Sequence, residues 1–398
     1  MRYSFRLAEL IGHKPDPRRR PGTIKAIVER TGLDRHQVAA LLKNEVKYIP
    51  LHALSRICDY LIETGRVAAD QLPGALFAVE PEHFWEMLAR RKVLDLVVGV
   101  RRTGKDFTYD GASIVASDAV LMGALLNGVT TLGGTSSHRS TERPPPGMTD
   151  GELELNHRPH PERLCQKMAW SPGQSDDEHV MARAREVYLE YVDSRDDKAL
   201  VCVGSTKSNP VVELILAETF GANPFESQDD VAAPKRRQCP IFMRYRDNDP
   251  HPASCWGGVT LSRGKDVSLP GIYYELKDGS WDMVPWTPQG ADAAFVFYVY
   301  RESQGRLDMA LGGFSGRATR LLAQLLISSG ERFWPAIYKG QGLQIGAFIV
   351  KFNDSGEDLD ELKTDLTAGT EVIALDPAVI ERRLKPAAVA ELIAGKPR

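Results

Sequence analysis

Residues 23–38 read TIKAIVERTGLDRHQV, and they contain two short helical patterns separated by one glycine. The first pattern begins at Thr23, whose hydroxyl can cap a helix. It ends at Gly32, because glycine adopts the left-handed backbone of a helix terminus at little cost. Asp34 is the expected cap of the second helix, Arg35–Lys43. The stretch therefore predicts two helices joined by a tight turn.

The second helix has an apolar side and a polar beginning. Its apolar side, formed by Val38, Leu41 and Leu42, is expected to pack against the preceding helix. The polar beginning carries three side chains of suitable length to reach base edges in a major groove, namely Arg35, His36 and Gln37. Further DNA contacts, several of them to phosphates, are expected from Thr23, Lys25, Lys43, Asn44, Lys47 and the basic loop Arg18, Arg19, Arg20.

The charge distribution supports this interpretation. Residues 1–75 hold 13 Lys and Arg against 8 Asp and Glu, whereas the remainder holds 37 against 45. A basic segment on an acidic body indicates that the first part meets a polyanion. A four-helix module used for protein contacts is the alternative.

The N-terminal residues resemble the Cro and lambda-repressor type (XRE) helix-turn-helix over residues 5–72. The positions that agree with the family are Thr23, Ile27, Val28, Gly32, Val38 and Leu41. Two positions depart from it: Ile24, where the family often has a Gln that touches DNA, and Asn44, where Gly is usual. The resemblance implies a transcriptional regulator that binds double-stranded operator DNA. Such regulators usually pair two reading heads, so we expect a homodimer.

Beyond residue 93 the chain alternates between strand-like and helix-like segments. Apolar strands are expected at Leu94–Val100, Ala199–Val203 and Leu307–Leu311. Helices are expected at residues 112–126, Pro210–Phe220 and Ala318–Ile327. This alternation is typical of a layered α/β domain. The sequence therefore predicts a small all-α helix-turn-helix domain (1–75), a helical connector (76–93) and a larger Rossmann-like α/β domain (94–398) for ligand sensing and dimerisation.

Clusters of small polar residues in the α/β part indicate a ligand site. The members that we expect to bind ligand are Gly204, Ser205, Thr206, Lys207, Ser208, Asn209, Gly312, Gly313, Ser315, Arg317, Gly133, Gly134 and Thr135. Turns of this kind present backbone N–H groups at a positive helix end, where phosphate or carboxylate binds. No cluster is a Walker A loop or a full G-x-G-x-x-G, and glycine can also serve close packing alone. We expect a crevice at the strand ends for a small anionic, nucleotide-like effector, and no other cofactor.

Two other functions remain as alternatives. Glu213 follows the turn at Gly204, and a carboxylate beside a bound ribose can drive glycosidic cleavage, as in TIR-like nucleotide hydrolases. The chain would then be a nucleotide- or NAD-hydrolysing enzyme with Glu213 as its catalytic residue. A structural DNA-binding protein without a ligand is the third hypothesis. The charged residues 244–249 are expected to form a solvated turn, although they could line a pocket.

The remaining expectations concern the environment of the chain. The five cysteines are widely spaced and include no C-x-x-C pair, which favours reduced thiols in the cytoplasm. The longest apolar runs, such as Ala293–Tyr300, are far shorter than the roughly 18 residues of a membrane span. No secretory signal is recognised at the N-terminus. His157, His160 and Cys165 fit no common metal-ligand spacing, so no metal site is expected.

Overall fold

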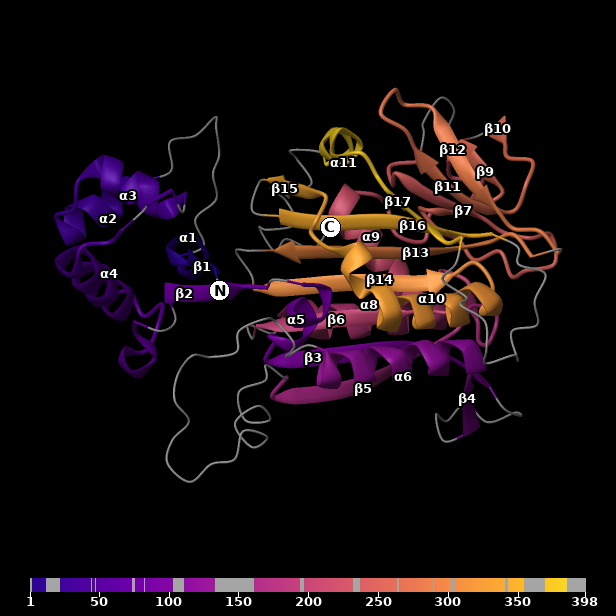
Figure 1. Ribbon diagram of the computed structural model, residues 1–398, viewed down its shortest axis with the longest axis horizontal. Coiled ribbons are helices and arrows are strands. Elements are labelled where there is room, and N and C mark those ends of the chain that lie inside the picture. The colour runs from indigo at the N-terminus through magenta and orange to yellow at the C-terminus, as the bar shows by residue number, and fades with distance from the viewer. Residues whose placement is uncertain are drawn as a thin grey trace.

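The computed structural model describes residues 2–11, 22–43, 45–46, 48–73, 76–81, 83–102, 111–132, 161–193, 197–231, 237–262, 265–288, 290–301, 305–340, 343–353 and 369–384. Figure 1 shows a group of N-terminal helices (indigo) at one end of the molecule and a large sheet with helices on both faces filling the rest.

The N-terminal part is built from helices around a small apolar core. Its elements are β1 (Arg2–Phe5), α1 (Leu7–Leu10), α2 (Thr23–Thr31), α3 (Arg35–Leu42), α4 (Leu51–Glu63), η1 (Ala69–Gln71) and β2 (Phe77–Glu80). The side chains of Leu7, Ile27, Val38, Ile57 and Leu61 meet in its centre and are fully buried.

The expected helical character of the first residues is only partly right. The apolar residues 5–11 favour one helix, but Phe5 ends strand β1 and helix α1 covers only Leu7–Leu10. Strand β1 pairs antiparallel with β2, with Phe5 opposite Phe77. That partner lies about seventy residues further along the chain, so local periodicity does not reveal it. The N-terminal part is therefore helical but not purely α.

The caps of the two central helices agree with expectation at two of three positions. Gly32 has φ 65° and ends α2 in the left-handed conformation, and the Asp34 side chain accepts hydrogen bonds from the amides of His36 and Gln37 at the start of α3. Thr23 is not a cap, which corrects the sequence prediction. Gly22 occupies the cap position of α2 without a side-chain hydrogen bond, and Thr23 is the first helical residue.

The α/β domain is organised by one mixed sheet, which confirms the expected fold class. Its strands run in the order β15–β16–β13–β14–β6–β3–β4, with β17 also on β16 and β5 on β3. The bounds are β3 (Val93–Arg102), β4 (Ala112–Ile114), β5 (Arg163–Trp170), β6 (Lys198–Val203), β13 (Asp292–Arg301), β14 (Arg306–Gly313), β15 (Tyr338–Gly340), β16 (Leu343–Phe352) and β17 (Glu371–Ala374). Four neighbours, β5, β3, β6 and β14, are parallel, whereas β13 and β16 are antiparallel.

Helices cover both faces of this sheet. One face packs on α8 (Asp177–Asp193) and α9 (Val211–Phe220). The other face packs on α5 (Phe84–Ala89), α6 (Ala116–Thr131) and α10 (Gly316–Ser329), which lie in front of the strands in Figure 1. Because both faces are covered, β6 is buried at every residue, which explains its continuous apolar sequence. Two short elements, η5 (Gly330–Phe333) and α11 (Pro377–Arg383), complete the helices.

Helix α6 begins later than its sequence pattern suggests. The expected helix at residues 112–126 starts only at Ala116, because Ala112–Ile114 form β4 against the end of β3. This shift brings the first turn of α6 to the carboxyl end of the parallel strands.

A second sheet, which the sequence did not predict, packs beside α9. It has the order β12–β11–β7–β8, and the pair β9–β10 lies next to it. Its bounds are β7 (Ile241–Arg244), β8 (Gly257–Gly258), β9 (Thr260–Ser262), β10 (Lys265–Asp266), β11 (Gly271–Glu275) and β12 (Trp281–Pro285). Met243, Tyr245 and Trp256 are fully buried in the same core as α9. The loop after β7 consequently lies against the main sheet.

Candidate functional site

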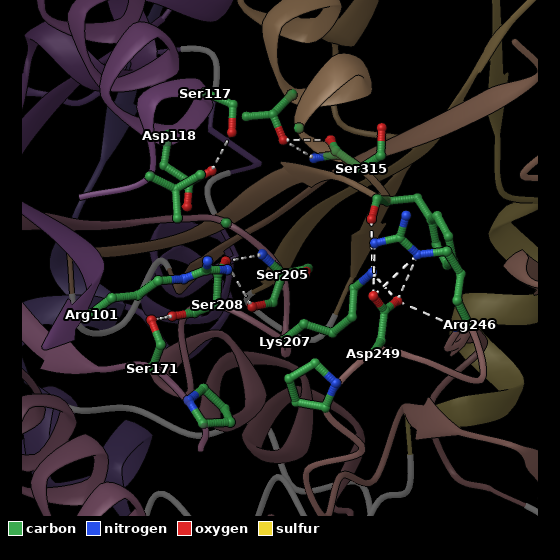
Figure 2. A pocket seen from close by; sticks show the side chains of 18 of the residues that line it. Arg101, Ser117, Asp118, Ser171, Ser205, Lys207, Ser208, Arg246, Asp249 and Ser315 are labelled. Carbon is green, nitrogen blue, oxygen red and sulfur yellow. Dashed lines mark hydrogen bonds and ion pairs between the residues drawn. The ribbon is translucent and has the colours of Figure 1, made fainter. Parts of the chain in front are cut away.

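A cavity of about 300 Å³ lies at the carboxyl ends of the four parallel strands. Figure 2 shows its labelled lining residues converging from several elements. Residues at or after the carboxyl end of each of the four strands take part, together with the first turn of α6 and the loop after β7. They include Arg101, Ser117, Asp118, Ser171, Gln174, Gly204, Ser205, Lys207, Ser208, Arg246, Asp249, Gly313, Ser315 and Gly316. Open α/β sheets bind ligands at this edge.

The turn after β6 supplies part of the wall and part of its support. Four of the residues predicted to bind ligand, Gly204, Ser205, Lys207 and Ser208, line the cavity. Asn209 does not line it. The Asn209 amide is fully buried, donates to the carbonyls of Val97 and Val203 at 3.0 Å each, and accepts from the Val211 amide at 3.1 Å. Its role is to hold the turn between β6 and α9.

Thr206 likewise supports the turn without lining the cavity. Its hydroxyl lies 2.9 Å from the hydroxyl of Tyr245, the residue that follows β7. The contact ties the turn after β6 to the second sheet.

The residues of the turn after β14 also fall into two groups, some lining the cavity and others supporting the turn. Gly313 and Ser315 line the cavity, and Ser315 caps α10 by accepting from the amides of Arg317 and Ala318. Gly312 is needed for packing, because an added Cβ would lie 2.7 Å from the backbone of Gly204. The Arg317 side chain turns away from the lining and donates to the Gly290 carbonyl at 2.8 Å. Gly133, Gly134 and Thr135 lie outside the described residues.

Replacing Gly204 with alanine is expected to destabilise the turn. Gly204 has φ 108°, and a Cβ would lie 2.3 Å from Ser208 Oγ. We expect the free energy of unfolding in urea to fall by about 1–2 kcal/mol. Gly123→Ala in α6 is the matched control, because its added Cβ meets nothing within 4 Å. An equal effect at both glycines would show that the conformation of Gly204 is not required.

Two cations of the cavity wall share one carboxylate. The Lys207 ammonium donates to Asp249 Oδ2 at 2.8 Å and to the Phe314 carbonyl at 2.9 Å, and it lies 4.2 Å from the centre of the Phe314 ring. Arg246 donates hydrogen bonds to the same carboxylate from Nη2 at 2.7 Å and from Nε at 3.0 Å. The Arg246 guanidinium lies 4.8 Å from the centre of the Trp286 ring. Figure 2 shows this cluster at one side of the cavity.

The pKa directions follow from this clustering. Burial lowers the pKa of Lys207 below its ordinary value, and the Asp249 carboxylate opposes that effect. Burial alone raises the pKa of Asp249, but the hydrogen bonds and charges of Arg246 and Lys207 outweigh it and lower the pKa to about 2. The Asp249 carboxylate is therefore ionised at neutral pH.

The opposite side of the cavity carries Arg101 and Asp118. Arg101, near the end of β3, extends toward the serines of the turn after β6 in Figure 2. Asp118 is in the first turn of α6 and only 4% exposed, and its Oδ2 has no hydrogen-bond partner among the described groups. Burial raises the pKa of Asp118, while hydrogen bonds from Ser117 and Ser208 and the charge of Arg101 oppose the rise.

The cavity as a whole favours an anion. Its lining holds three cationic side chains, Arg101, Lys207 and Arg246, against two carboxylates. The N-terminal turns of α6 and α10 also border it, and helix N-termini carry partial positive charge. The arrangement can bind a phosphoryl or carboxylate group.

Several lining residues were missed by sequence reasoning, and one prediction was wrong. Residues 244–249 favour a solvated turn, yet Arg246 and Asp249 form a wall of the cavity. The prediction of a solvated turn failed because the partners of Asp249 and Arg246 are distant in the sequence. Lys207 and Trp286 lie about forty residues away on either side. Arg101, Asp118 and Ser171 carry no local motif, and only the convergence of the strand ends identifies them.

The structure places Glu213 outside the cavity lining. Its carboxylate is buried in α9 and accepts hydrogen bonds from Ser254 Oγ at 2.6 Å, the Cys255 amide at 2.5 Å and the Phe225 amide at 2.9 Å. Burial raises its pKa, and the bonds from Cys255 and Ser254 oppose this. Glu213 thus anchors two loops to α9.

A second candidate site is the surface formed by α2 and α3. The two helices pack through Ile27, Val38 and Leu41, which are buried. Arg35 and His36 are exposed at the start of α3. This is the geometry of a helix-turn-helix whose second helix presents its beginning to a duplex.

Residues 18–63 match the Cro/C1-type HTH DNA-binding domain. The expected resemblance is confirmed, and the N-terminal helices form an HTH domain of the kind found in DNA-binding transcriptional regulators. The matched residues precede the large sheet. No curated protein and no solved structure matches the chain.

The remaining residues expected to touch DNA are placed as follows. Gln37 and Thr23 are half-buried on the surface of the HTH domain, and Lys43 is exposed. Lys25 is exposed and lies 3.6 Å from Glu29, an ion pair that solvent weakens. The other expected contacts fall outside the described residues, namely Arg18, Arg19, Arg20, Asn44 and Lys47.

Within the described ranges, no helix is both long and apolar enough to cross a membrane. No group of three His, Cys, Asp or Glu side chains in those ranges is placed to hold a metal ion. All five cysteines are free thiols, and Cys239 and Cys255 are buried with their sulfurs 3.7 Å apart.

Proposed function

We propose that this protein is a one-component transcriptional regulator whose α/β domain senses a small anionic, nucleotide-like ligand. The proposal rests on one observation, namely that the chain joins a DNA-binding HTH domain to a cation-lined cavity at the ends of four parallel strands. A DNA-binding domain needs no such cavity for its own contacts. A cavity of this kind on the same chain supplies a site through which a metabolite can control DNA binding.

On the DNA side, the start of α3 reads the operator. Arg35 recognises guanine and Gln37 adenine, because both side chains can make paired hydrogen bonds in the major groove. His36 adds a base-edge contact, while Thr23, Lys25 and Lys43 bind phosphates. Two copies of the chain place two HTH domains on a pseudopalindromic site, since a single reading helix covers only a few base pairs.

On the ligand side, the anion binds among Arg101, Lys207 and Arg246. A ligand controls operator affinity only if it binds one arrangement of the two HTH domains more tightly than another. In this scheme the α/β domains form the dimer contacts. Ligand binding in the cavity then changes the spacing of the two HTH domains through these contacts.

The test uses the full-length protein and an operator selected from a random duplex library. Fluorescence anisotropy then measures operator affinity with and without AMP, ADP and NAD, and mass spectrometry of the denatured protein identifies any ligand that co-purifies. We expect at least one nucleotide to change operator affinity, and Arg101→Ala to weaken that response. Failure to enrich any sequence would refute the operator assignment. A nucleotide panel without effect would refute ligand sensing, and release of nicotinamide from NAD would favour the hydrolase.

A further inference from the structure

The Asp249 carboxylate holds the cations that an anionic ligand would need. It accepts from the Lys207 ammonium at 2.8 Å, from the Arg246 guanidinium at 2.7 Å and from the Arg246 amide at 3.2 Å. Its side chain is 10% exposed and that of Lys207 is 11% exposed, so these charges face each other with little solvent between them. The three groups border the same cavity.

The cluster also joins two separate parts of the fold. Lys207 belongs to the turn after β6 in the main sheet, whereas Arg246 and Asp249 belong to the loop after β7 in the second sheet. The Phe314 carbonyl holds Lys207 from the end of β14. An anion that enters the cavity and approaches these cations therefore meets the Asp249 carboxylate of the β7 loop.

We propose that Asp249 occupies a phosphoryl-binding subsite and that the phosphoryl group of the ligand displaces it from Lys207 and Arg246. This inference rests on the proposed function, because it names the ligand group and the intramolecular competitor at the same cavity. Binding replaces the ion pair between Lys207 and Asp249 with one between Lys207 and the ligand, so that the ligand, in place of Asp249, bridges the turn after β6 and Arg246 of the β7 loop.

The charge balance selects a phosphoryl group over a carboxylate. Asp249 offers one negative charge and two acceptor oxygens, and a carboxylate on a ligand would offer the same without being tethered. A phosphate monoester carries about −1.5 to −2 charge at pH 7 and three strong acceptor oxygens. It can engage Lys207 and Arg246 more strongly than Asp249 does and still present an oxygen to the rest of the cavity. Arg101, on the opposite side, is the remaining cation for a second phosphoryl group.

Calorimetric titration of the full-length protein with sodium pyrophosphate tests the proposal. Asp249→Asn preserves the side-chain shape but removes the negative charge of Asp249, and with it the ion pairs to Lys207 and Arg246. We expect this variant to bind pyrophosphate at least about tenfold more tightly than the wild type, because its subsite is vacant more often.

Asp247→Asn is the matched control. Asp247 lies on the same loop, but its side chain is 84% exposed and pairs with Arg244 instead of the cavity cations. The substitution removes the same charge, and we expect wild-type affinity for pyrophosphate. Lys207→Met provides an independent variant and is expected to reduce that affinity at least about tenfold.

Each contrary outcome has a definite meaning. Equal or weaker pyrophosphate binding by Asp249→Asn would overturn the proposal and make Asp249 a residue that positions the cations for ligand. If that variant does not fold, unchanged binding by Lys207→Met would overturn it instead. No binding by any variant would also overturn it. A nucleotide effect on operator affinity, seen together with any of these results, would leave the proposed function intact.

Discussion

Replacing Arg35 and Gln37 together by alanine is expected to lower operator affinity about a hundredfold or more while the HTH domain stays folded. Each paired contact to a base edge contributes about 1–3 kcal/mol of discrimination, and a dimer loses the contacts in both half-sites. The fold should survive because α3 is held by the buried Val38 and Leu41, and because the Asp34 cap uses only the backbone amides of residues 36 and 37.

Anisotropy on the selected operator measures this loss, and circular dichroism checks the fold. Arg30→Ala is the control, because Arg30 is an exposed arginine of α2 that is not among the residues expected to contact DNA. We expect it to change operator affinity by less than about threefold. Wild-type affinity in the double variant would show that α3 does not read the operator.

The second large effect is expected at Glu213. Glu213→Ala should lower the free energy of unfolding by about 3 kcal/mol or more. It leaves the amides of Cys255 and Phe225 and the Ser254 hydroxyl without their acceptor, and each unsatisfied buried group costs about 1–3 kcal/mol. Urea unfolding measures the change.

Glu213→Gln is the conservative comparison for the same position. It retains one acceptor oxygen and nearly the same volume, so we expect a smaller loss of stability than in Glu213→Ala. If Glu213→Ala were as stable as the wild type, the hydrogen bonds to Phe225 and Cys255 would not anchor these loops. A folded Glu213→Gln that lost an NAD-hydrolysing activity of the wild type would support a catalytic role.

Local features were predictable from the sequence because their causes are local. Gly32 and Asp34 act through backbone groups within four residues, so the residue types alone predict the ends of α2 and the start of α3. The Thr23 cap was wrong by one position, since Gly22 takes that place and either residue is compatible with a helix start. The turn after β6 was also recognisable, because an apolar strand, a glycine and small polar residues stand next to one another.

Features that depend on distant partners were not predictable in this way. Strand β1 forms by pairing with Phe77–Glu80, a partner that no local pattern in residues 2–5 reveals. The charged sequence of the loop after β7 predicts solvent exposure. The tertiary fold instead packs Lys207 and Trp286 against this loop. Asp118 looks like an ordinary first-turn acid, and it is buried only because α6 begins at the strand ends.

The sequence alone predicts a helix-turn-helix followed by alternating strands and helices. Helix capping, hydrophobic periodicity and side-chain polarity each depend on residues only a few positions apart. The cavity and its charge arrangement came from the tertiary fold. Arg101, Lys207 and Asp249 stand on three segments far apart in the chain, and parallel pairing of β3 and β6, together with packing of the second sheet, brings them to one edge. Electrostatic interactions depend on distance in space, and that distance is set only when the sheets have packed.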